Sequence, residues 1–147
     1  MSAPLLSVND LTVNFRTDAG WLTAIEGVGF DLAAGETLGI VGESGSGKSV
    51  TALSILQLHA RATTRIPSGR IAFDGRDLLA LPERALRRVR GGEIAMIFQD
   101  PMSSLNPVLT VADQISETLM LHQGLDRAEA RKRAIGLLDH LAASDLH

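Results

Sequence analysis

The most informative stretch of the sequence is GESGSGKS, residues 42–49. It matches the pattern G-x-x-x-x-G-K-[ST] of the loop that cradles phosphates in nucleoside-triphosphate-binding proteins. The apolar run 37–41 precedes it, and apolar residues at helical spacing follow it over residues 49–58. This predicted order of strand, loop and helix is the context in which the motif binds phosphate. The alternative, a glycine-rich turn without a ligand, gives no reason for a lysine and a serine at 48 and 49.

The residue types of the loop explain how it would hold an anion. Gly45 and Gly47 allow a tight backbone whose N–H groups point inward, and the following helix presents its positive end to the phosphates. The mechanics of the motif predict that the Lys48 ammonium reaches the β- and γ-phosphates, while the Ser49 hydroxyl ligates Mg²⁺.

Composition narrows the class of protein. The chain has 147 residues, of which 45% are hydrophobic, so it can build the core of one domain. Four Phe, one Trp and no Tyr offer few stacking surfaces for single-stranded nucleic acid, and a net charge of −3 gives no general attraction to its backbone. The absence of cysteine excludes disulfides and thiolate metal sites, and the four histidines lack metal-ligand spacing. With neither a leader-like N-terminus nor a long apolar run, we expect a soluble cytoplasmic chain.

Short strands separated by turns are expected before the loop and suggest an antiparallel layer beside the strand at 37–41. They cover residues 5–8, 11–15, 21–25 and 28–32. A further strand is expected at 71–73, after a loop at 67–69.

Three helices and one strand are predicted for the second half of the chain. A helix is expected at 83–90, ended by two glycines, and its arginines at 84, 87, 88 and 90 are better explained as a solvated face than as a phosphate site. The apolar run 94–98 is typical of a strand buried on both faces. Capping patterns at Thr110 and Asp126 predict the last two helices.

With these elements placed, the chain resembles the N-terminal half of an ATP-binding-cassette transporter ATPase, and more narrowly the dipeptide, oligopeptide and glutathione importer group. The resemblance rests on GETLGIVGESGSGKSV, residues 35–50, and on the more specific MIFQDPMSSLNP, residues 96–107. It implies an α/β fold: a P-loop NTPase core with an N-terminal antiparallel β layer and the start of a helical subdomain. We expect the β layer over residues 1–36, the core over 37–105 and the helical start over 106–147.

The resemblance also implies a set of site residues, with ATP and Mg²⁺ as cofactors. Gln99 matches the family's glutamine, which reaches toward Mg²⁺ and the attacking water and lies beside the transmembrane partner. The alternative interpretation is a polar residue at a strand end. Phe15 matches the aromatic residue that stacks on adenine, although a core phenylalanine fits the same pattern. The expected catalytic residues are Lys48 and Gln99, and the expected metal ligands are Ser49 and Gln99. The expected nucleotide-binding residues are Phe15, Gly42, Glu43, Ser44, Gly45, Ser46, Gly47, Lys48, Ser49 and Val50.

The implied partners are transmembrane permease subunits and a second ATPase subunit, which places the protein at the inner face of the cell membrane without insertion into it. No nucleic acid is expected as a partner.

The sequence departs from the family pattern after the second stretch. The family continues to a Leu-Ser-Gly-Gly-Gln-like motif, an apolar strand ending in Asp-Glu, a D-loop and a switch histidine, and none of these is present. Residues 137–140 have the apolar-then-acidic order of the strand that ends in Asp-Glu, but they lie in a helical pattern. Asp100, which also follows an apolar run, could be mistaken for the Mg²⁺-binding carboxylate at the end of that strand. We therefore expect a truncated cassette that binds ATP without hydrolysing it alone.

Two other classes use the same loop. A GTPase would need an Asn-Lys-x-Asp guanine-reading motif, and no asparagine here begins one. A cassette ATPase acting on DNA or the ribosome is disfavoured by the low basicity and by the residues after Gln99.

Overall fold

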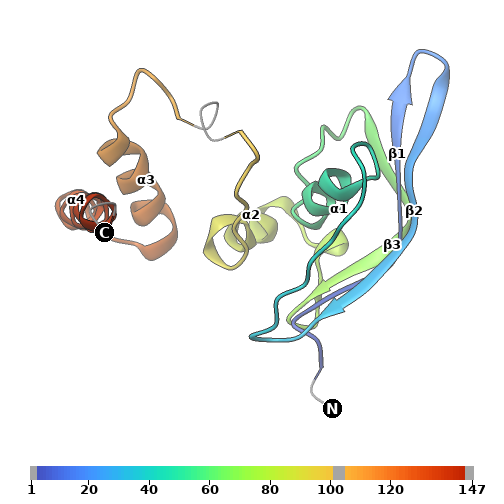
Figure 1. Ribbon diagram of the computed structural model, residues 1–147, viewed down its shortest axis with the longest axis horizontal. Coiled ribbons are helices and arrows are strands. Elements are labelled where there is room, and N and C mark those ends of the chain that lie inside the picture. The colour runs from blue at the N-terminus through green and yellow to red at the C-terminus, as the bar shows by residue number, and fades with distance from the viewer. Residues whose placement is uncertain (1–2, 101–104, 145–147) are drawn as a thin grey trace. The chain divides into compact units, whose positions relative to one another are not determined.

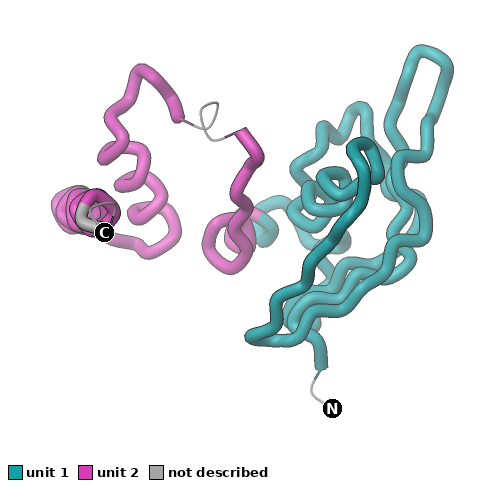
Figure 2. The backbone as a smooth tube through the Cα atoms, viewed as in Figure 1, with its two compact units in different colours: residues 1–86 teal, residues 87–147 magenta. Residues whose placement is uncertain are grey.

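The computed structural model describes residues 3–100 and 105–144 and divides the chain into two compact units, residues 1–86 and 87–147 (Figure 2). Each unit has its own set of elements. The first holds the sheet and the helix that follows the phosphate loop, and the second holds the last two helices.

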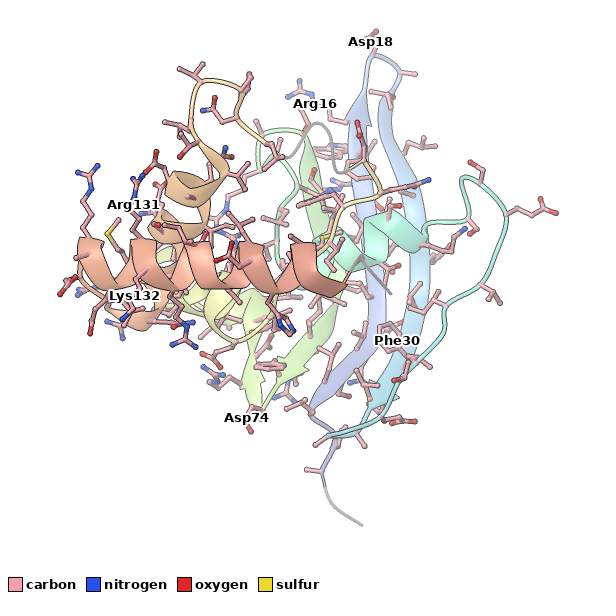
Figure 3. All side chains as sticks on the ribbon, turned by 60° about the vertical axis from the view of Figure 1, so that its left-hand side comes forward. Arg16, Asp18, Phe30, Asp74, Arg131 and Lys132 are labelled. Carbon is pink, nitrogen blue, oxygen red and sulfur yellow. The ribbon has the colours of Figure 1, made fainter. Side chains whose placement is uncertain are left out.

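An antiparallel sheet of four strands in the order β2-β1-β3-β4 forms the first unit (Figure 1). The long strands β1 (Leu6–Thr17) and β2 (Gly20–Leu32) form a hairpin whose tip carries Asp18 (Figure 3). β3 (Thr64–Phe73) pairs with the other edge of β1, and the short β4 (Arg76–Asp77) ends the sheet. The predicted antiparallel layer is thus confirmed.

The predicted strands were too short. Residues 6–8 and 11–15 lie in a single strand, β1, which begins one residue later than predicted, because a bulge around Asp10 absorbs the break in the apolar pattern. The loop predicted at 67–69 is wrong, since these residues belong to β3 and Ser68 pairs with Thr12. Proline and glycine are tolerated there because they lie next to the irregular register.

The buried side chains of the first unit come mainly from the sheet. Alternation along β1, shifted by the bulge between Val8 and Leu11, brings Val8, Leu11 and Val13 into the core. Ile25 and Ile71 join them from the flanking strands. α1 (Lys48–Ile55) contacts β2 and contributes the fully buried Ser54. Leu78, in the 3₁₀ helix η1 (Leu78–Ala80), is also fully buried. The sheet therefore supports the helix that begins at the phosphate loop.

The two apolar runs predicted as buried strands are not strands in this structure. Residues 37–41 have no regular structure, and Ile94 forms only an isolated bridge with Arg90. Val41 is 93% exposed and Ile97 is 96% exposed. A strand forms only by pairing with a neighbour, and no strand within residues 3–100 and 105–144 pairs with these runs.

The predicted helices are confirmed. α2 (Glu83–Gly92) loses helical geometry at Arg90 and Gly91, as the two glycines predicted. α3 (Val111–Gln123) is capped by the Thr110 hydroxyl, which accepts from Asp113 N at 3.1 Å. Asp126 Oδ1 accepts from Glu129 N at 2.9 Å at the start of α4 (Arg127–Ser144). A small core joins α3 and α4 through Leu119, Ala130 and Ala134.

Candidate nucleotide-binding site

The phosphate loop leads from residue 42 directly into α1, whose first residue is Lys48. Gly47 caps the helix with φ 91°, a left-handed conformation that favours glycine. A Cβ built on Gly47 would lie 2.2 Å from Ile25 Cγ2. Glycine is therefore required here for two reasons, the backbone angle and the close approach of the loop to β2.

The Lys48 side chain folds back into the loop. Its Nζ donates to Gly42 O at 2.6 Å, to Glu43 O at 2.7 Å and to Ser46 Oγ at 3.1 Å. The loop is thus wound around the ammonium group, and a Cβ on Gly42 would meet Ser46 Oγ at 2.6 Å. This cradle combines a positive charge with a backbone that a phosphate chain can approach closely. The residues present therefore fit the phosphates of a nucleoside triphosphate, as the motif predicts.

The N-terminal end of α1 continues directly from the loop. Thr51 N donates to Gly47 O, and Ser46 N donates to Glu43 O, so the loop closes with a turn that runs into the helix. Ser49 follows Lys48 and is exposed. Its hydroxyl is available to a cation, and Mg²⁺ normally keeps waters and phosphate oxygens rather than requiring a protein cage. Accordingly, the described residues contain no cluster of three His, Cys, Asp or Glu side chains that could hold a metal.

A hollow of about 400 Å³ lies beside the loop in the first unit. Its walls include residues of β2, the irregular run 38–41 and the loop residues Ser46, Gly47 and Lys48. Leu38 and Ile40 line it while remaining 41% and 51% exposed. The irregular run 38–41 thus forms one wall of a hollow that reaches the loop.

Phe15 lies near the end of β1 and is half-buried. Its ring meets that of His59 edge to face, with ring centroids 5.1 Å apart. His59 Nε2 lies 3.1 Å from Val50 O and 3.2 Å from Ser54 Oγ, both on α1. Phe15 is therefore connected through one histidine to the helix that carries Lys48. No motif or periodic pattern in the sequence signals this contact.

Gln99 lies in the second unit and is exposed. The structure brings together the loop residues and links Phe15 to their helix, but all of these belong to the first unit. Pro101, Met102, Ser103 and Ser104, which belong to the stretch that resembles peptide importers, lie outside the described residues. Residues 137–140 lie within α4, which confirms that they are not an acidic strand end.

Residues 25–147 match the protein family described as ABC transporter. The chain belongs to this family. Among similar proteins, a Brucella abortus protein named as a peptide import ATP-binding protein is 57% identical over 98% of this chain. The oligopeptide transport ATP-binding protein OppD of Salmonella typhimurium is 53% identical over 92% of the chain.

Solved structures agree with the family. The dimeric ATP-binding cassette MJ0796, in a post-hydrolysis state bound to ADP and Pi, matches 91% of this chain with a TM-score of 0.77 at 25% identity. The chain spans 43% and 40% of the length of the two relatives and 56% of that cassette. Within the described residues, no helix is both long and apolar enough to span a lipid bilayer.

Proposed function

We propose that this chain is the nucleotide-binding part of an ATP-driven peptide importer and that its loop binds MgATP. The observation that carries the proposal is the wrapping of residues 42–46 around the Lys48 ammonium at the start of α1. When a triphosphate enters, Lys48 exchanges its bonds to Gly42 O and Glu43 O for phosphate oxygens. The Ser49 hydroxyl is the proposed ligand for the accompanying Mg²⁺.

The base would stack on the exposed part of the Phe15 ring, and Gln99 would help to ligate Mg²⁺ and orient the attacking water. Gly42, Glu43, Ser44, Gly45, Ser46 and Gly47 would supply the backbone around the phosphates, and Val50 continues the helix behind them. Hydrolysis depends on positioning and on neutralising phosphate charge, for which a carboxylate is also needed. The 147 residues contain no acidic strand end of the family type. The chain is therefore proposed to bind ATP and to hydrolyse it only within a more complete cassette.

Permease subunits and a second ATPase subunit are the proposed partners, at the inner face of the cell membrane. The names of the relatives support peptides as the transported class. The proposed domain division is a β layer over 1–36, a core over 37–105 and the start of a helical subdomain over 106–147.

Calorimetric titration with ATP and GTP, each with and without Mg²⁺, tests the nucleotide part of this proposal. We expect ATP to bind, Mg²⁺ to strengthen the binding, and Ser49→Ala to remove the Mg²⁺ effect while leaving metal-free binding intact. Ser44→Ala is the matched control, since Ser44 is an exposed loop serine without a proposed metal role. Equal Mg²⁺ dependence in both variants would contradict the assigned metal ligand.

A further inference from the structure

His59 joins the ring of Phe15 to the first helix. The two rings meet at an interplanar angle of 75°, a favourable edge-to-face arrangement for aromatic side chains. Phe15 comes from β1, where it pairs with Leu22 of β2 and Thr64 of β3. His59 follows α1 along the chain, so the contact joins the sheet to the segment that leaves the phosphate-loop helix.

Hydrogen bonds fix the orientation of the His59 ring. Val50 O can only accept, and Ser54 Oγ already donates to it at 2.7 Å. Nε2 lies within reach of both oxygens, so it must carry the hydrogen that it donates to them. The ring is therefore held by α1 through Nε2. Ser54 is fully buried, which makes this anchor a rigid one.

Both rings remain partly accessible. Phe15 and His59 are half-buried, so each packs against the protein while keeping part of its surface open to a ligand. His59 also borders a hollow of about 250 Å³, which is lined as well by Ser54, Gln57 and Thr64. The Thr64 hydroxyl is buried there and has no hydrogen-bond partner in the described part of the chain. His59 is thus held by α1 and by the Phe15 ring, and it borders this hollow.

We infer that His59 is a positioning residue for nucleotide binding: it sets the orientation of the Phe15 ring relative to the phosphate loop, so that the base and the phosphates are recognised at a fixed separation. The inference rests on the proposed function, in which Phe15 stacks on the base. Val50 and Ser54 stand two and six residues after Lys48 on the same helix. A ring held by this helix therefore fixes Phe15 in the same frame as the ammonium that contacts the phosphates.

A ligand that lacks the base separates this role from a general contribution to stability. Inorganic tripolyphosphate can bind to the loop through its phosphates, but it has no base that could stack on Phe15. We expect His59→Ala to weaken MgATP binding about five- to tenfold and to leave the tripolyphosphate affinity unchanged. Phe15→Ala should act in the same way, and the double variant should be little worse than either single one, because both remove the same interaction. His140→Ala, at an exposed histidine of α4, is the matched control and should change neither affinity.

The measurement is a dissociation constant for each ligand by calorimetry, with circular dichroism to verify that each variant folds. His59→Phe is the second variant, since it keeps an aromatic ring beside Phe15 but loses the hydrogen bonds to α1. It should retain the fold and still bind ATP more weakly than the wild type. Equal losses for ATP and tripolyphosphate, or an unchanged ATP affinity in His59→Ala, would overturn the inference while leaving the proposed function standing. Failure of the wild-type chain to bind either ligand would overturn both.

Discussion

Gly47 and Ile25 are in such close contact that a single added carbon on the glycine would lie 2.2 Å from the isoleucine Cγ2. This contact places the end of the phosphate loop against β2, in the buried part of the sheet. Rigid support of this kind keeps a binding loop in the geometry that its ligand needs.

Substitution of this glycine should therefore cost more than substitution of its neighbour. Gly45 has a similar positive φ of 83° but no atom within 4 Å of an added Cβ. Gly45→Ala should lower the free energy of unfolding by about 1 kcal/mol, because alanine is strained at a positive φ. Gly47→Ala should lower it by a further 1–3 kcal/mol, roughly, because the added Cβ overpacks against Ile25. Urea unfolding of the two variants measures the difference. Equal losses of stability in the two variants would show that Ile25 moves aside for the added Cβ without an energetic penalty.

Removing the cap of α3 should destabilise the second unit locally. Thr110→Ala deletes the hydroxyl that accepts from Asp113 N and should cost about 1 kcal/mol. Thr118→Ala is the control, because Thr118 lies in the interior of the same helix and alanine is the better helix former there. Amide hydrogen exchange of α3 reports the effect. Faster exchange in Thr118→Ala than in Thr110→Ala would rule out the capping role.

The isolated 147-residue chain should self-associate. The runs 37–41 and 94–98 expose apolar side chains together with backbone groups that would pair in a sheet. Val41→Lys combined with Ile97→Lys should reduce association without loss of stability, because both side chains are more than nine-tenths exposed. Leu11→Lys, at a fully buried position, should instead unfold the chain.

Size-exclusion chromatography with light scattering measures this association. A sharp, reversible unfolding transition of a monomer without nucleotide would argue against it. It would indicate that the chain forms a self-sufficient domain despite these exposed runs.

The isolated chain should not hydrolyse ATP above background. The loop can hold phosphates, but the 147 residues contain neither the acidic strand end nor the glycine-rich motif of the family. Phosphate release is the measurement. A rate of about 1 s⁻¹ or more that depends on Lys48 would contradict this expectation.

The loop, the caps and the helices could be predicted from sequence because each depends on local chemistry. Thr110 and Asp126 carry side chains that bond the next turn, and Gly47 precedes the lysine of a defined motif. The runs 37–41 and 94–98 were predicted wrongly as strands because apolar content indicates burial only when partner strands are present. The contact between Phe15 and His59 joins residues far apart in the sequence, and no periodic pattern reveals such a contact.

Ligand-induced thermal stabilisation shows whether the loop around Lys48 binds MgATP. At about ten times the dissociation constant, binding should stabilise the wild-type fold by roughly 1.4 kcal/mol. Lys48→Ala should abolish this shift. Lys132→Ala, which removes an exposed lysine on α4 (Figure 3), should retain it in full. The same shift in wild type and Lys48→Ala would contradict the account.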